Sequence, residues 1–366
     1  MYAFGRSYNK NHFERKKKMK KFIALLLIAV MVFAMTACAP AAQQGDGKDT
    51  YAIVCKDASN PYMKRMVSGF KTACEALGVN FAEKSPETTS AQDQITIVNE
   101  LIAQGVKAIA IAANDAAALE ATLKTATEAG IAIVTLDSDT KGSQMFINQA
   151  GVKEVAQVLV ESIYDMAGGE GEFAILSASS TATNQNAWIA AMEEELTDAC
   201  YAGKVSPTLD KKYGNDDLTE STTQANAFVA ENAVDCIISP TTVGIAAAGQ
   251  VLKTANSEIG LTGLGLPSEM QSFMPTKADD DAFASVCPYM MLWDVIHLGA
   301  TAGAATYAAV TDEFDGAVGS SFEMDAFRDY EATTYEAYQS GDGTAVLAGV
   351  PYIFYKGNMA EWIDVL

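Results

Sequence analysis

The chain has 366 residues, of which 49% are hydrophobic, so it is long enough to bury the cores of two domains. It carries 46 acidic and 25 basic residues, a formal net charge of −21, which disfavours nucleic acid as a partner. Bidentate capture of carboxylate or phosphate is done mainly by arginine, and only Arg65 and Arg328 follow the first 20 residues. An anionic ligand is therefore disfavoured as well.

A secretory leader is expected at the N-terminus. Basic residues from Arg15 to Lys21 precede an apolar run from Phe22 to Ala34, which is too short to cross a membrane as a helix. Cys38 follows Thr-Ala, an arrangement that resembles the lipobox of bacterial lipoproteins. This resemblance implies a signal over 1–38, a lipidated Cys38 as membrane anchor, and a polar tether over 39–49. Met1 and Met19 both remain open as the true start.

Beyond the leader, 17 basic residues stand against 45 acidic ones, a charge of −28. Such a charge keeps an exported protein soluble.

From Tyr51 onward, strand and helix patterns alternate. Apolar runs predict strands over 51–55, 108–112 and 131–136. Asn60-Pro61 begins a helix that Gly78 ends, and Ser90 with Asp93 forms a capping box before an amphipathic helix. A further helix is expected over 116–129.

A second series of the same kind begins near Gly151. It comprises helices over 152–166, 185–196, 219–232 and 243–255, and strands over 173–176, near Val205, over 236–239 and over 261–265. A short helix follows Pro267, and 289–310 form a strand and a long helix that return to the first lobe.

This alternation predicts an α/β fold of two doubly wound parallel-sheet lobes joined by a hinge. The expected N-terminal lobe is 50–150 plus about 290–325, and the expected C-terminal lobe is 151–289 plus about 326–366.

Enzyme and cofactor chemistry finds little support. Five cysteines follow the leader without CxxC spacing, which indicates neither a zinc site nor a disulfide framework, and Cys55 and Cys236 are expected to be core residues. His297 is the one histidine beyond the leader, and no G-x-S-x-G motif occurs. Gly168-Gly169-Glu170-Gly171 lies between a helix and a strand, the wrong order for a phosphate loop. No catalytic residue, metal or cofactor is predicted.

Polar and aromatic side chains gather instead where strands end or helices begin. In an open α/β sheet, ligands lie at the carboxyl ends of the strands. The candidate ligand-binding residues are Lys56, Tyr62, Met63, Asp137, Asn184, Gln185, Trp188, Pro240, Thr242, Trp293 and Asp294. Amides, hydroxyls and charged groups hydrogen-bond the hydroxyls of a neutral polyol, and aromatic rings cover its C–H face. For single members, capping (Asn184, Thr242) or packing (Met63, Trp188) remains an alternative.

Several of these segments together resemble the periplasmic-binding-protein type I family of ABC-transporter substrate-binding lipoproteins, from about Tyr51 to Ala305. The rhamnose/autoinducer-2 binding branch is most similar, on Lys56, Leu136–Thr140, Ile147–Gln149, Asn184–Trp188, Ile238–Pro240 and Leu292–Val295. The resemblance implies a ligand between two hinged lobes, held by Lys56 and Asp137 from the first. Asn184, Gln185, the Pro240 carbonyl and Thr242 would act from the second, with Tyr62 and Met63 against the ligand ring.

Two departures bear on the ligand. Autoinducer receptors carry Asp where this chain has Asn184 and Ala where it has Thr242, and the rhamnose-binding members look closer at both positions. Ribose-type members place an arginine where this chain has Ser138, so ribose is disfavoured.

The sequence therefore predicts an extracytoplasmic, non-catalytic sugar receptor, anchored by lipid to the outer face of the cytoplasmic membrane, or periplasmic if an outer membrane exists. A monomer would close on L-rhamnose or a related deoxyhexose and deliver it to an ABC permease with its cytoplasmic ATPase. The alternative is an autoinducer-2 receptor on the same scaffold. The effector domain of a sugar-responsive repressor would need a basic helix-turn-helix where this chain has a signal, and a secreted enzyme has no supporting motif.

Overall fold

The computed structural model describes residues 47–206, 209–275 and 285–366. The expected signal, Cys38 and the tether up to residue 46 lie outside the described residues. Asp49–Leu366 form one compact unit.

A seven-stranded sheet organises the first lobe, with strand order β13-β14-β5-β4-β3-β1-β2. All neighbours in it are parallel except β13 and β14. The strands are β1 (Thr50–Val54), β2 (Asn80–Glu83), β3 (Ala108–Ile111), β4 (Ala132–Leu136), β5 (Met145–Asn148), β13 (Tyr338–Ser340) and β14 (Gly343–Leu347).

The helices of the first lobe begin and end where the capping residues predict. The Asn60 side chain accepts the Tyr62 N–H at the start of α2 (Pro61–Leu77), and Gly78 ends this helix at φ 73°. The Ser90 hydroxyl accepts the Asp93 N–H at the start of α3 (Ala91–Gln104). The remaining two are α4 (Ala116–Glu128) and α10 (Val295–Val310).

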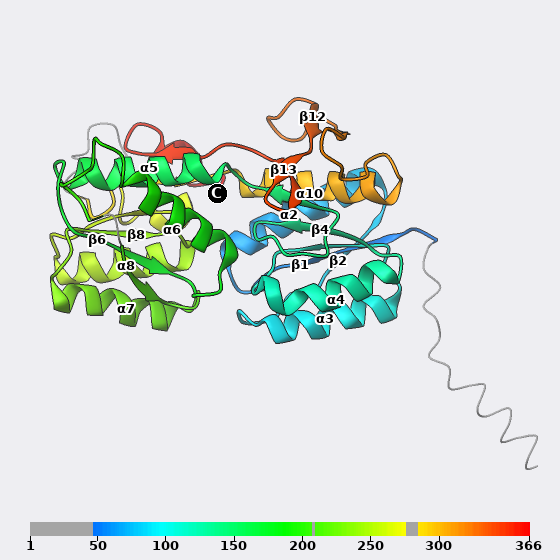
Figure 1. The fold of residues 1–366 in the computed structure, drawn as a ribbon, viewed down its shortest axis with the longest axis horizontal. Coiled ribbons are helices and arrows are strands. Elements are labelled where there is room, and N and C mark those ends of the chain that lie inside the picture. The colour runs from blue at the N-terminus through cyan, green and yellow to red at the C-terminus, as the bar shows by residue number, and fades with distance from the viewer. Residues whose placement is uncertain (1–46, 207–208, 276–284) are drawn as a thin grey trace, which may run out of the picture. The chain divides into compact units, whose positions relative to one another are not determined.

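Two hydrophobic cores cover the two faces of this sheet. Helices α2 and α10 lie over one face, and α3 and α4 lie over the other (Figure 1). Successive side chains of a strand point to opposite faces, so Tyr51 and Ile53 of β1 join the core beneath α2 and α10, whereas Ala52 and Val54 join the core beneath α3 and α4. Burial on both faces explains why these strands read as continuous apolar runs.

The second lobe contains a four-stranded sheet of order β7-β6-β8-β9, with every neighbouring pair parallel. Its strands are β6 (Phe173–Ser177), β7 (Asp210–Tyr213), β8 (Cys236–Ser239) and β9 (Gly260–Gly263). Its helices are α5 (Val152–Met166), α6 (Thr183–Glu195), α7 (Leu218–Glu231), α8 (Thr242–Ala255) and the short α9 (Pro267–Met270). The two parallel sheets confirm the predicted fold class, and the buried Cys55 and Cys236 are core residues as expected.

The strand expected near Val205 is wrong. Val205 makes isolated bridges to Gly171 and Ala202, and the strand that pairs with β6 is β7, a few residues later. β7 lies at the edge of the sheet and contains Lys211 and Lys212, so it carries no apolar run. β2, at the edge of the first sheet, is only partly buried, and β5 follows β4 without an intervening helix; neither was predicted.

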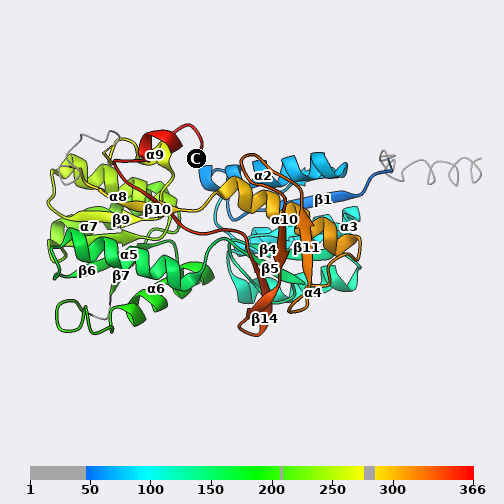
Figure 2. The same cartoon turned by 90° about the horizontal axis from the view of Figure 1, so that it is seen from above.

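The C-terminal segment departs from the expected division between the lobes. β13 and β14 belong to the first sheet, where β14 pairs in parallel with β5, so the assignment of 338–347 to the second lobe is wrong (Figure 2). The pairing of strands far apart in the chain is invisible to local patterns.

Beyond β14, the chain returns to the second sheet. β15 (Tyr352–Phe354) pairs with β10 (Met290–Leu292), and β10 bridges to Leu264 after β9. The final helix α11 (Met359–Trp362) contacts α9. β11 (Ser321–Met324) and β12 (Thr333–Glu336) form a separate antiparallel pair.

None of the helices in the described part of the chain combines the length and the apolar character needed to cross a membrane.

Gly69 of α2 and Gly299 of α10 let these two helices approach closely (Figure 2). A Cβ at Gly69 would overlap the carbonyl oxygen of Ile296, and a Cβ at Gly299 would overlap that of Met66. These atoms are helix backbone, so the overlap cannot be relieved by a rotamer change.

We predict that Gly69→Ala lowers the free energy of unfolding by about 1–3 kcal/mol, because α2 and α10 must move apart. Ser68→Ala, at an exposed position of the same helix, is the matched control and should change it by less than about 0.5 kcal/mol. Urea unfolding of both variants measures the difference, and equal midpoints would contradict the close packing.

Candidate functional site

A cavity with about 350 Å³ of empty space, partly open to solvent, lies where the loops of the two sheets meet. The lining residues are Lys56, Asn60, Tyr62, Met63, Asp137, Asn184, Gln185, Trp188, Asp216, Pro240, Thr241, Thr242, Leu264, Leu292 and Trp293. Every residue predicted to bind the ligand is among them except Asp294.

A buried ion pair joins the ends of two strands of the first sheet. Lys56 follows β1 and Asp137 follows β4, and Lys56 Nζ lies 2.7 Å from Asp137 Oδ2. The two residues are only 7% and 3% exposed. Burial of an unpaired charge is costly, so each group stabilises the charged form of the other within the cavity.

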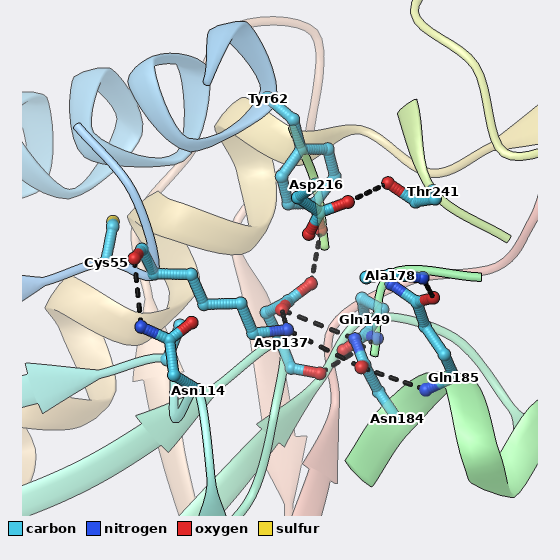
Figure 3. A network of polar contacts seen from close by, with 12 residues as sticks. Cys55, Tyr62, Asn114, Asp137, Gln149, Ala178, Asn184, Gln185, Asp216 and Thr241 are labelled. Atoms are coloured by element: carbon cyan, nitrogen blue, oxygen red, sulfur yellow. Dashed lines mark hydrogen bonds and ion pairs between the residues drawn. The ribbon is translucent and has the colours of Figure 1, made fainter. Parts of the chain in front are cut away.

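Tyr62 connects this ion pair to the aromatic wall. Its hydroxyl donates to Asp137 Oδ1 over 2.8 Å (Figure 3). The same hydroxyl accepts from Trp293 Nε1 over 2.9 Å. Burial, together with the neighbouring Asp137 carboxylate, raises the pKa of Tyr62 well above its usual value. The phenol therefore stays protonated and acts as the donor to Asp137.

Two amides at the start of α6 approach the pair from the second lobe. Asn184 Nδ2 donates to Asp137 Oδ2 over 3.3 Å, and Lys56 Nζ donates to Asn184 Oδ1 over 3.5 Å. Gln185 Oε1 accepts from the Ser177 hydroxyl and from the Ala178 N–H (Figure 3). The bonds to Gln185 fix which end of its amide faces β6. The bond between Lys56 and Asn184 joins residues 128 positions apart in the chain.

Aromatic rings form the apolar side of the cavity. The Trp188 and Trp293 ring centroids lie 5.6 Å apart, and Tyr62 meets Trp293 edge-on at 6.3 Å. Met63 lines the same cavity. Edge and tilted contacts of this kind hold the rings in place, so the wall is preformed.

Asp216 is a cavity residue that the sequence analysis missed. It follows β7, lies at φ 51°, and its carboxylate accepts a hydrogen bond from the Thr241 hydroxyl (Figure 3). Burial raises the pKa of Asp216, although the bond from Thr241 acts in the opposite direction. The signal lay in Asn215-Asp216 at the end of a strand, but the strand itself was placed near Val205. Asn60, Thr241, Leu264 and Leu292 were also missed as lining residues.

Asp294 does not line the cavity. Its Oδ1 accepts the N–H groups of Ile296 and His297 at the start of α10, both over 3.0 Å, and its Oδ2 lies 3.0 Å from Arg328 Nη1. A carboxylate with these partners caps a helix, so the expected ligand contact of Asp294 is corrected to a structural role.

Charge in the cavity is nearly balanced, with one ammonium and the carboxylates of Asp137 and Asp216. No arginine lines it, since Arg65 donates to Ser268 Oγ and Arg328 pairs with Asp294. Across 47–206, 209–275 and 285–366, no group of three His, Cys, Asp or Glu side chains could hold a metal ion. The arrangement suits a neutral ligand with several hydroxyl groups.

Known proteins share both the sequence pattern and the fold. A family model described as a periplasmic binding protein domain matches residues 51–313. The crystal structure of an ABC transporter solute binding protein from Clostridium phytofermentas, with bound L-rhamnose, is 41% identical to this chain. That match has a TM-score of 0.82 and covers 87% of this chain and 99% of the other.

Two further relatives are more distant. A protein from Clostridium saccharobutylicum in complex with AI-2 shares the fold at a TM-score of 0.74 with 21% identity, over 86% of this chain and 99% of the other. The ribose import binding protein of Escherichia coli is 28% identical over 116 residues, which span 31% of this chain and 39% of the length of that relative.

The family match covers most of the described chain, and the 41% identical relative aligns over nearly its whole length. The chain therefore belongs to the periplasmic binding protein family of ABC transporter solute-binding proteins, whose members are sugar-binding transport proteins rather than enzymes.

Proposed function

We propose that the cavity binds L-rhamnose or a related neutral deoxyhexose. The observation that carries this proposal is the buried Lys56–Asp137 pair, flanked by amides and an aromatic wall and without a lining arginine. A neutral sugar can exchange hydrogen bonds with such a pair without adding net charge to the cavity. The L-rhamnose in the 41% identical relative from C. phytofermentas supports the same ligand.

The lining residues divide into polar and apolar contacts. Lys56, Asp137, Asn184, Gln185, Thr242 and the Pro240 carbonyl would hydrogen-bond the ring hydroxyls. Tyr62, Met63, Trp188 and Trp293 would cover the C–H face and the methyl group. Asp216 joins the polar group as an additional contact. Hydrogen-bonding groups left unpaired by an analogue that lacks a hydroxyl would disfavour that analogue.

Autoinducer-2 is the second candidate, and Asn184 argues against it. Asn184 Nδ2 donates to the Asp137 carboxylate. The aspartate that autoinducer receptors are expected to carry at this position could not donate while ionised, and it would place a second carboxylate beside Asp137. The donor pattern of this cavity therefore differs from that of an autoinducer-2 site.

Membership of the family supports a wider role in sugar transport. In this proposal Cys38, which lies outside the described residues, also takes part. The protein would be anchored through lipidated Cys38 to the outer face of the cytoplasmic membrane, or reside in the periplasm where an outer membrane exists. It would act as a monomer, close on its ligand by hinge motion, and deliver the sugar to the permease and its cytoplasmic ATPase.

Isothermal titration tests the ligand. We expect L-rhamnose to bind, and L-mannose, which carries a hydroxymethyl group in place of the rhamnose methyl group, to bind at least roughly tenfold more weakly, because the added hydroxyl would be buried against apolar rings. Equal affinity for the two sugars would contradict the apolar methyl site. Heat with autoinducer-2 and none with L-rhamnose would overturn the ligand assignment.

Asp137→Asn is predicted to weaken L-rhamnose binding by roughly 10- to 100-fold, because a hydrogen bond to a buried charge contributes about 1.5–3 kcal/mol. The variant also leaves Lys56 unpaired, so thermal stability should fall. Lys56→Met combined with Asp137→Asn should recover stability but not binding.

Asp139→Asn is the matched control for Asp137, two residues away and outside the cavity lining. It should bind L-rhamnose as the unaltered protein does. Loss of binding in Asp139→Asn, or its retention in Asp137→Asn, would contradict a direct role for Asp137.

The raised pKa of Asp216 predicts that the difference in stability between the unaltered protein and Asp216→Asn depends on pH. Its raised pKa means that the folded protein holds the proton over a pH range in which the unfolded chain has released it, so its contribution to stability falls as pH rises above the ordinary value of 3.8. Asp216→Asn removes this loss, so its melting temperature should gain on that of the unaltered protein between pH 4 and pH 7. A difference in melting temperature between the two proteins that stays constant across this pH range would contradict the raised pKa of Asp216.

A further inference from the structure

Gln149 is a buried residue that lies behind the cavity rather than in its lining. It belongs to the connection between β5 and α5, through which the chain first passes from one sheet to the other, and it is 2% exposed. Its Nε2 donates to the backbone carbonyl of Asp137 over 3.1 Å (Figure 3). A residue of the crossing thus holds the main chain of a residue proposed to bind the ligand.

The backbone of Asp137 is in a conformation that needs such support. Asp137 lies at φ 62°, and the Ser138 N–H donates to the Leu136 carbonyl over 2.6 Å, which closes a three-residue turn centred on Asp137. Turns of this kind with positive φ are rare and strained, and they persist where the surroundings hold them. This turn aims the Asp137 carboxylate at Lys56 and Tyr62.

The Gln149 amide acts here as a donor only. Its Oε1 is buried and has no hydrogen-bond partner among the described residues. The reversed amide would set this oxygen against the Asp137 carbonyl, an unfavourable contact between two acceptors. The donated bond is therefore retained although it leaves the amide oxygen unsatisfied.

A second connection between the sheets lies beside Gln149. The Ala348 N–H, just after β14, donates to the Asn148 carbonyl over 2.8 Å, and β14 then leads to β15 next to the second sheet. Two segments that connect the two sheets are thus joined next to Gln149. A change in their conformation would move the donor that holds Asp137.

We propose that Gln149 is a positioning residue that couples the connections after β5 and β14 to the orientation of Asp137. The hydrogen bond that Gln149 donates stabilises the turn at Asp137. Displacement of these connections would break this bond and release the turn. Because the effect on ligand affinity rests on the proposed function, the test includes a measurement that needs no ligand.

Gln149→Met keeps the length of the side chain and removes the donor, and Asn148→Leu is the matched control. Asn148 is the neighbouring buried amide, and its Nδ2 donates away from the cavity to the Tyr338 hydroxyl over 3.1 Å. We expect Gln149→Met to raise the Kd for L-rhamnose about tenfold. Its melting temperature should change little, because the substitution also removes the unsatisfied Oε1.

Hydrogen–deuterium exchange of ligand-free protein supplies the independent measurement. Gln149→Met should speed exchange in the peptide 131–142, which contains the turn at Asp137, whereas Asn148→Leu should change neither this exchange nor the Kd. If Gln149→Met fails to fold, Gln149→Leu, which also lacks a donor, replaces it with the same expected results.

Unchanged exchange in 131–142 overturns the proposal, as does faster exchange with an unaltered Kd in a protein that binds L-rhamnose. A lower melting temperature with unchanged exchange would indicate a merely structural role and also overturns it. If the unaltered protein binds no L-rhamnose, the proposed ligand fails, and the exchange measurement still decides whether Gln149 holds the turn.

Discussion

The buried ion pair between Lys56 and Asp137 is the interaction on which the site depends. Its two members come from the carboxyl ends of β1 and β4, strands that are separated in the sheet only by β3. Their pairing keeps two charges in a cavity where neither would be tolerated alone. The amide of Asn184 and the phenol of Tyr62 also donate hydrogen bonds to the carboxylate, so Lys56 is the only cation that it pairs with among the cavity-lining residues.

This balance explains the kind of ligand the cavity suits. A phosphate or carboxylate would meet the Asp137 and Asp216 side chains without an arginine to offset them. A neutral sugar adds no charge, and its hydroxyls can both donate to the carboxylates and accept from Lys56 and the amides. The aromatic side formed by Trp188 and Trp293 adds apolar area on which a methyl group or C–H face can pack.

Closely packed helices and the segments that connect the two sheets both lie near the pair. α2 and α10 pack against each other at Gly69 and Gly299, on one face of the sheet whose strands lead to Lys56 and Asp137. Asp294 caps the start of α10. The connections after β5 and β14 pass between the sheets and are joined by the hydrogen bond from Ala348 to Asn148. In the proposed hinge closure, these connections would bend while the packed helices hold the ion pair in place.

The sequence alone determined the α/β alternation, the helix starts at Asn60 and Ser90, and most of the cavity lining, because apolar runs, caps and strand-end polar residues are local signals. Tertiary structure decided what depends on partners distant in the chain. β14 joins the first sheet only through its pairing with β5, and the lysine-rich β7 is a strand only because β6 pairs with it. Asp216 lines the cavity as a consequence of that pairing. Asp294 does not line it, because its carboxylate caps α10 and pairs with Arg328. Local pattern cannot reveal such choices, since the free energy that settles them comes from contacts between segments far apart in sequence.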